Sequence, residues 1–367
     1  MSGTSPLNAQ PHPNRVPRDP KTARTRRTAR IAPIFASAIA SLSLATLTPP
    51  VIAQRLFLDQ TPSGHYALDV MLGQDGPYAF ILDTGASHTA IAEDIAIAHG
   101  FTPRHTDLAD VQSLTTQFEA ERFRVERLII ETLPPVDLET VVIPLVPDEP
   151  HIVAGLLGAD ALPGDRLEID FINGIIDLDA QSPHFADGLF SPDRQLIFAR
   201  ARVRGLRRSF PVMLDTGTAY SLVNPALGRE MRAQSHGWRF VLNGVDGRTD
   251  ADTQTVLVRR LQIGGLCTAR VAMLEADLDI FRALDWNDGP AMVIGMDVLR
   301  RARVVIDRNT GEVEISPGPR VDDCVGHRVT WDDRHITAAI DEDTPSPPER
   351  WNPSNYTVRE VYRLLRN

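Results

Sequence analysis

The chain is poor in cysteine and lacks a histidine pattern suited to a metal. Its 367 residues include only two cysteines, Cys267 and Cys324. This count excludes a disulfide-rich scaffold and permits one disulfide in an oxidising compartment. The ten histidines are scattered, with neither an HExxH motif nor a close pair. We therefore expect no metal site and no cofactor.

Positive charge is scarce outside the N-terminal segment, and Lys21 is the single lysine of the chain. Without residues 1–53 the chain has 31 basic and 47 acidic residues, a net charge of −16. Such an acidic protein is repelled by nucleic acid and by anionic membrane surfaces. The composition therefore argues against both as partners.

The apolar run at residues 31–47 is 17 residues long, which is short for a membrane-spanning helix. A basic segment precedes it, and Val51-Ile52-Ala53 follows it with small residues at the positions that signal peptidase reads. Together these features predict a secretory signal peptide over residues 1–53 and a periplasmic or secreted protein. An uncleaved membrane anchor is the alternative, and would be the one route to a membrane partner.

The triplet Asp-Thr-Gly occurs twice, each time directly after an apolar strand pattern. The first copy begins at Asp83 in AFILDTGASHTAI and the second at Asp215 in FPVMLDTGTAYSLV. Two carboxylates held face to face cannot both stay ionised, because like charges at short range repel. One of them keeps a proton, so the pair supplies an acid and a base from one residue type. This chemistry hydrolyses a peptide bond with an activated water and without a metal.

The sequence around the triplets indicates an internal duplication. A hairpin pattern precedes each triplet, and an apolar-apolar-Gly element follows it, ending at Gly158 and at Gly295. A short helical stretch and a second hairpin come next in both halves, with turns at Asn173-Gly174 and at 309–311. The landmarks keep their order at a nearly constant offset, 132 positions between the aspartates and 137 between the glycines. Chance turns would not repeat in this way.

These landmarks resemble the retropepsin-like and pepsin-like aspartic peptidases over roughly residues 60–317. The resemblance implies a mostly β fold of two pseudo-symmetric acid-protease repeats with the active-site cleft between them. Repeat 1 would span 54–188 and repeat 2 would span 189–318, with a single chain acting as a monomer. It also implies a catalytic dyad and residues that support it. The implied dyad is Asp83 and Asp215, and the implied supporting residues are Thr84, Gly85, Ser87, Thr216, Gly217 and Thr218.

One element departs from the family pattern, in which a glycine-bearing hairpin covers the cleft. Repeat 2 has a plausible covering hairpin at 243–257 with Gly244 and Gly247, whereas the segment 109–123 of repeat 1 has no glycine. A polar tail follows at 319–367, where a capping-box match at Thr357 opens a short helix. The apolar face of that helix is expected to dock on repeat 2.

The sequence therefore predicts an extracytoplasmic aspartic endopeptidase that acts on an extended polypeptide. A non-catalytic peptide-binding or inhibitor module on the same fold is the alternative, because folds outlive functions. The two intact triplets favour the enzyme, and the glycine-free segment of repeat 1 keeps the alternative open.

Overall fold

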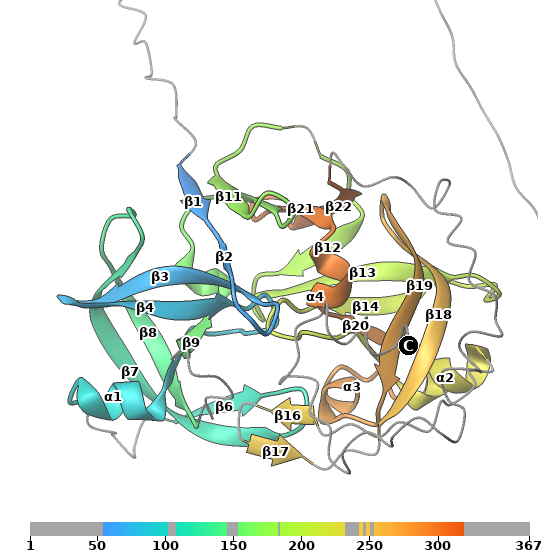
Figure 1. Ribbon diagram of the computed structural model, residues 1–367, viewed down its shortest axis with the longest axis horizontal. Helices are drawn as coiled ribbons and strands as arrows, with labels where there is room; N and C mark the ends of the chain where they lie inside the picture. Colours follow the sequence, from blue (N-terminus) through green and yellow to red (C-terminus); the bar gives the residue numbers. More distant parts are fainter. Residues whose placement is uncertain are drawn as a thin grey trace, which may run out of the picture. The chain divides into compact units, whose positions relative to one another are not determined.

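The computed structural model describes residues 54–101, 108–144, 153–182, 184–231, 242–244, 247–249 and 253–318 (Figure 1). All of them belong to one compact unit. The expected signal peptide at 1–53 and the expected tail at 319–367 lie outside the described residues. Among the described residues, no helix has the length and apolarity that crossing a membrane requires.

Repeat 1 forms an eight-stranded sheet with the strand order β2-β3-β4-β9-β5-β8-β7-β6. The side chains of the short strand β5 are all buried, whereas the long strand β7 mixes buried and exposed positions. The short helix α1 (Glu93–Ala98) follows β5. The strands are β2 (Asp59–Gln60), β3 (Tyr66–Leu72), β4 (Asp75–Leu82), β5 (Ala90–Ala92), β6 (Leu108–Gln112), β7 (Gln117–Ile130), β8 (Val136–Ile143) and β9 (Val153–Leu157).

Repeat 2 contributes most strands of a twelve-stranded sheet with the order β1-β11-β10-β21-β22-β12-β13-β14-β20-β15-β19-β18. These strands are β1 (Arg55–Phe57), β10 (Arg166–Asp170), β11 (Ile175–Leu178), β12 (Gly188–Ser191), β13 (Leu196–Val203), β14 (Phe210–Leu214), β15 (Leu222–Val223), β18 (Gln254–Ile263), β19 (Leu266–Glu275), β20 (Met292–Ile294), β21 (Ala302–Asp307) and β22 (Glu312–Pro317). A separate small hairpin joins β16 (Leu242–Gly244) to β17 (Gly247–Thr249). The helices of repeat 2 are α2 (Pro225–Met231), α3 (Asp279–Ala283) and α4 (Met296–Leu299), and repeat 1 has the short 3-10 helix η1 (Ala159–Ala161) after β9.

The duplication is visible in the strand pairing. The strand before the first triplet, β4, pairs in parallel with β9, and its counterpart β14 pairs in parallel with β20. The parallel pair β5–β8 likewise matches β15–β19. In both halves the first hairpin strand also pairs with the long strand, β3 with β7 and β13 with β18. The predicted fold class, mostly β with two pseudo-symmetric repeats, is confirmed.

The second hairpins of the two repeats join in one sheet, which the local sequence pattern did not predict. Strand β10 of repeat 1 pairs antiparallel with β21 of repeat 2, and Leu167 lies opposite Ile306. The buried side chains of this seam belong to one core shared by both repeats. The predicted boundary between residues 188 and 189 falls at the start of β12, which pairs with β22. The repeats are therefore continuous in backbone hydrogen bonding.

Cys267, in β19, is disulfide-bonded. Cys324 is the other cysteine of the sequence and lies outside the described residues.

Candidate active site

Asp83 and Asp215 stand at equivalent places, one residue beyond the ends of β4 and β14. Each strand is held beside its apolar-apolar-Gly partner. The N–H of Asp83 donates to the carbonyl of Leu157 at 2.9 Å, and the N–H of Asp215 donates to that of Ile294 at 2.9 Å. Both aspartates are buried, with 8% and 4% of their surface exposed. The two parallel strand pairs thus deliver the carboxylates to one buried place.

The threonines of the triplets bind the two loops to each other reciprocally. The N–H of Thr84 donates to Thr216 Oγ1 at 2.9 Å, and the N–H of Thr216 donates to Thr84 Oγ1 at 3.2 Å. Each hydroxyl also donates to a carbonyl across the axis, Thr84 to Leu214 at 3.0 Å and Thr216 to Leu82 at 2.6 Å. Four buried hydrogen bonds therefore fix the two loops against each other.

The triplets need glycine at their third position because the carboxyl group of the opposite aspartate lies too close for any side chain. Each glycine N–H donates to its own aspartate, Gly85 to Asp83 at 2.8 Å and Gly217 to Asp215 at 2.9 Å. Each glycine also lies against the opposite aspartate. A Cβ on Gly85 would lie 2.6 Å from Asp215 Cγ, and one on Gly217 would lie 2.5 Å from Asp83 Cγ. No side chain fits at either position while the two carboxylates stay together.

The two carboxyl groups lie close together, so the protonation of one affects the pKa of the other. Burial, with the neighbouring Asp215 carboxylate, raises the pKa of Asp83 well above its usual range. Burial also raises the pKa of Asp215, but hydrogen bonds oppose that rise. One of them is donated by Thr218 Oγ1 to Asp215 Oδ2 at 2.7 Å, whereas the equivalent residue in repeat 1 is Ala86. This asymmetry favours Asp83 as the protonated member and Asp215 as the ionised one.

A second matched network braces the strands behind the carboxylate pair. In repeat 1, Asp160 accepts hydrogen bonds from the N–H and hydroxyl of Thr89, and Thr89 Oγ1 accepts from the Gly158 N–H. In repeat 2, Asp297, Ser221 and Gly295 repeat these contacts at 2.6–3.0 Å. The sequence analysis missed both networks. The sequence does contain a repeated pattern that could have revealed them. Thr89 and Ser221 each lie six positions after a triplet aspartate, and Asp160 and Asp297 each lie two positions after the glycine of the apolar-apolar-Gly element.

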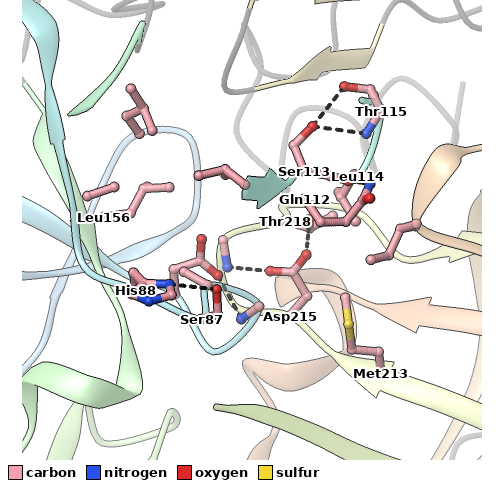
Figure 2. A pocket seen from close by; sticks show the side chains of 18 of the residues that line it. Ser87, His88, Gln112, Ser113, Leu114, Thr115, Leu156, Met213, Asp215 and Thr218 are labelled. Atoms are coloured by element: carbon pink, nitrogen blue, oxygen red, sulfur yellow. Dashed lines mark hydrogen bonds between the residues drawn. The ribbon is translucent and has the colours of Figure 1, made fainter. Parts of the chain in front are cut away.

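The hairpin of repeat 1 formed by β6 and β7 covers the carboxylate pair, and its tip residues Ser113, Leu114 and Thr115 line the same cavity (Figure 2). The turn needs no glycine because a side chain builds it. Ser113 Oγ accepts from the N–H groups of Thr115 and Thr116 at 3.3 and 3.1 Å, and the Ser113 N–H donates to the Thr116 carbonyl at 2.8 Å. The glycine-free segment therefore does provide a cover. In repeat 2, only the backbones of β16 and β17 are described.

The cavity at the carboxylate pair measures about 210 Å³ and has an apolar wall on each side. The repeat 1 wall belongs to the small cluster around Val141, Ile143 and Leu156. The repeat 2 wall belongs to the cluster around Met213, Leu222 and Ile280, against which Leu114 packs. Two histidines, His65 and His88, also line the cavity. Among the described residues, no group of three or more His, Cys, Asp or Glu side chains is arranged to hold a metal.

The structure brings most of the predicted site residues together. Thr84, Gly85, Thr216 and Gly217 contact the pair or its loops, and Thr218 bonds to Asp215 as described above. The Ser87 hydroxyl also lines the cavity, but its hydrogen bond, 3.0 Å long, goes to His88 Nδ1 rather than to Asp83. His88, which follows Ser87 in the chain and belongs to no predicted site, also lines the cavity (Figure 2). His65 carried no motif signal and was missed.

Comparison with known proteins agrees with this geometry for the first repeat. Residues 68–161 match the family model described as "Aspartyl protease". The resemblance to aspartic peptidases that the sequence analysis drew is therefore confirmed over this range. A solved structure, that of the aspartic proteinase from Irpex lacteus, has 14% sequence identity and a TM-score of 0.43. That match covers 72% of this chain and 97% of the other. No curated protein matches the sequence.

Proposed function

We propose that the chain is an aspartic endopeptidase, which hydrolyses peptide bonds with a water molecule activated between Asp83 and Asp215. The observation that carries this proposal is the pair of buried carboxyl groups, Asp83 and Asp215, which two matched loops deliver into one covered cavity. A structural role alone gives little reason to bury two acids against each other, because their repulsion and desolvation cost stability.

The asymmetry of the pair assigns the steps. Asp215, the ionised member, takes a proton from the water, while Asp83 donates its proton to the oxygen of the scissile carbonyl. The water oxygen bonds to the carbonyl carbon and forms a tetrahedral diol. The C–N bond then breaks as the amine nitrogen takes a proton from Asp215 and Asp83 recovers one from the diol. The products are a carboxylic acid and an amine, and the pair returns to its singly protonated state.

The walls of the cavity support a polypeptide substrate with apolar side chains flanking the scissile bond. Aliphatic groups of both repeats face the space beside the carboxylate pair. Burying an apolar side chain there removes its surface from water, which stabilises the complex. An extended segment would also have the backbone of the covering hairpin beside it, as in strand addition.

The proposed reaction takes place outside the cytoplasm, in the periplasm or after secretion. The basic segment, the apolar run at 31–47 and the Val51-Ile52-Ala53 site support this location. Sequencing the N-terminus of the protein from a fractionated native host tests it. A chain beginning near Gln54 in the periplasm or medium would agree with the proposal, whereas an intact Met1 in the cytosol would contradict it. An intact N-terminus in the membrane fraction would favour the anchor.

Incubating the purified protein with an unfolded protein substrate across acidic to neutral pH tests the activity. We expect a bell-shaped pH profile, because the pair works only when singly protonated. A statine-type inhibitor should block cleavage, since its hydroxyl stands in for the attacking water, and chelators should have no effect. Hydrolysis that persists with the inhibitor and stops with a chelator would contradict the proposal. Tight peptide binding without cleavage would favour the non-catalytic module.

A further inference from the structure

One face of repeat 2 carries a cluster of exposed arginines, which begins on strand β13. Arg200, Arg202 and Arg204 are exposed at alternate positions in and just beyond this strand, whereas Ala201 and Val203 between them are buried. Successive side chains of a strand point to opposite faces of the sheet, so the three arginines share one face.

Strand β18 extends this face. Arg202 lies opposite Gln262, and the N–H of Arg204 donates to the carbonyl of Arg260 at 3.0 Å, one position further along the same register. Gln262 and Arg260 are both exposed. Side chains that lie opposite each other in an antiparallel pair are neighbours on one face, and like charges placed there repel. We call Arg200, Arg202, Arg204 and Arg260 the arginine face.

The described part of the chain supplies no counter-charge to the arginine face. None of the ion pairs between described residues includes one of its members. The Arg200 guanidinium donates to the hydroxyl and the carbonyl of Ser209. Asp187 adjoins the turn between β18 and β19, but its carboxylate accepts the N–H of Ile315 at 3.1 Å. This positive face belongs to a chain whose net charge is −16 without residues 1–53.

Cys267 stands on the same face, in the second strand of the β18–β19 hairpin (Figure 1). It pairs with Gln262, in the row of opposed residues that Arg202 begins. Cys267 is disulfide-bonded, and Cys324 is the one other cysteine of the sequence. Within one chain, its partner is therefore Cys324. Such a bond holds the residues around Cys324 beside the arginine face.

Strand β22, which leads toward Cys324, lies next to this hairpin. The N–H of Gly265, in the β18–β19 turn, donates to the carbonyl of Ile315 in β22 at 2.8 Å. Gly318 is the last residue that the structure describes, and Cys324 follows it by six positions. Six residues of extended chain reach at most about 20 Å. Cys267 is only two residues from the turn, so the disulfide is within reach.

The sequence that begins at this disulfide is strongly acidic. Residues 322–343 include seven acidic residues and two arginines, a net charge of −5 with histidine neutral. Asp322 and Asp323 directly precede Cys324. Opposite charges attract when they lie within the screening distance of the salt, roughly 10 Å at 0.1 M. The disulfide therefore brings carboxylates to the arginine face.

We propose that the acidic segment 322–343 docks on the arginine face, where the Cys267–Cys324 disulfide tethers it. An exposed ion pair is weak by itself, but a tether keeps the local concentration of carboxylates high. The partner of this surface is then a segment of the same chain. The proposal does not rest on peptide hydrolysis.

Peptide mapping of the full chain without reduction tests the tether. Protease digestion followed by mass spectrometry should recover one linked pair of peptides, which contain Cys267 and Cys324. The protein should also run as a single chain in a denaturing gel without reductant. A disulfide between two copies would overturn the proposal.

Footprinting with phenylglyoxal, which modifies exposed arginines, tests the docking. Arg122 in β7 is exposed in repeat 1 and serves as the internal reference. At low salt, Arg202, Arg204 and Arg260 should react roughly threefold to tenfold more slowly than Arg122, because several weak ion pairs act together. At about 1 M salt, where charges are screened beyond roughly 3 Å, this protection should disappear. Arginines of the face that react as fast as Arg122 at low salt would contradict the docking.

A variant of the full chain removes the negative charge of the segment. Its four substitutions are Asp322→Asn, Asp323→Asn, Asp332→Asn and Asp333→Asn. The arginine face should then react nearly as fast as Arg122 at low salt. The matched control is Glu349→Gln with Glu360→Gln, which removes acids of the tail outside the segment and should leave the protection unchanged. Protection that persists in the fourfold variant would overturn the proposal.

Two further outcomes keep the test decisive. If the fourfold variant does not fold, the salt dependence of the wild-type footprint decides, and protection that salt does not remove contradicts the proposal. Unprotected arginines in a wild-type protein that binds heparin would assign the face to an external anionic partner and would also overturn the proposal. None of these measurements needs turnover, so a failure of the proposed function leaves them intact.

Discussion

The carbonyl of Leu114, at the tip of the repeat 1 hairpin, accepts a hydrogen bond from the N–H of Ile280 in helix α3 at 3.2 Å. The Leu114 side chain packs on the apolar cluster of repeat 2 beside this bond. The hairpin therefore spans the cavity and is fastened on the far side. Under the proposed function, we expect this contact to limit how fast a large substrate reaches the cavity.

Shortening Leu114 should loosen the hairpin. Leu114→Ala removes the apolar anchor but leaves the backbone bond, so we expect faster amide exchange at residues 112–117 and a faster association rate for a large substrate. Hydrogen exchange read by mass spectrometry measures the first effect. Leu108→Ala is the matched control, because Leu108 lies in the same hairpin but is exposed. Equal exchange in both variants would show that the Leu114 contact does not hold the hairpin.

Asp83 and Asp215 should behave as one unit. Asp83→Asn, Asp215→Asn and the double variant should each reduce peptide hydrolysis by roughly 10³-fold or more and reach a similar floor. None should unfold, because replacing a buried acid of raised pKa removes an unfavourable charge at neutral pH. Thermal denaturation at pH 7 checks the second point. Full activity in either single variant would exclude the proposed mechanism.

The exchange of hydrogen bonds between Thr84 and Thr216 should appear as a loss of stability when either hydroxyl is removed. Each threonine-to-alanine change leaves a buried N–H and a buried carbonyl without these hydrogen bonds, so we expect a loss of roughly 1–3 kcal/mol in the free energy of unfolding. The double variant should lose roughly the sum of the two, because each hydroxyl serves a different N–H and a different carbonyl. Urea unfolding measures all three. Serine keeps the hydroxyl, and serine variants should remain near wild type; alanine variants as stable as wild type would argue against the reciprocal network.

Asp297 should make stability depend on pH. Burial raises its pKa to about 6, against an ordinary value of 3.8. The protonated form is favoured in the folded state, so this contribution is fully present below about pH 4 and is lost as the pH rises through 6. A two-unit shift corresponds to roughly 3 kcal/mol. The unfolding free energy of Asp297→Asn should therefore change less between pH 4 and 6.5 than that of the wild type.

The exposed Asp193→Asn provides the control for net charge in that series. Its stability should follow the wild-type curve across the same pH range. If Asp297→Asn follows that curve as well, Asp297 is not the source of the dependence.

Local sequence was sufficient for the elements that carry the carboxylate pair. Asp83 and Asp215 follow strands with clear apolar patterns, and the Asn173-Gly174 turn is closed by a glycine at φ 65°. The threonines and glycines of the triplets were predicted as supporting residues through the resemblance to aspartic peptidases, which rests on the repeated triplets. Each of these features depends on a few neighbouring residues, which the sequence displays directly.

The features that escaped prediction depend on contacts between distant residues. The pairing of β10 with β21 joins residues that are far apart in the chain, such as Leu167 and Ile306, and hydrophobic periodicity does not specify such a partner. The sequence analysis looked for glycines and named 243–257 as the plausible covering hairpin. The turn of the repeat 1 hairpin is instead closed by the Ser113 side chain. His65 lines the cavity only once the chain has folded, and no motif marks it.

The pairing of β10 with β21 also has a consequence for how the protein behaves on dilution. The two halves of the cavity are joined by one covalent chain and by backbone hydrogen bonds between their hairpins. The two halves therefore associate within one molecule. The fraction of protein with an assembled cavity does not depend on the protein concentration. Specific activity should stay constant down to concentrations at which a site assembled from two separate chains would fall apart.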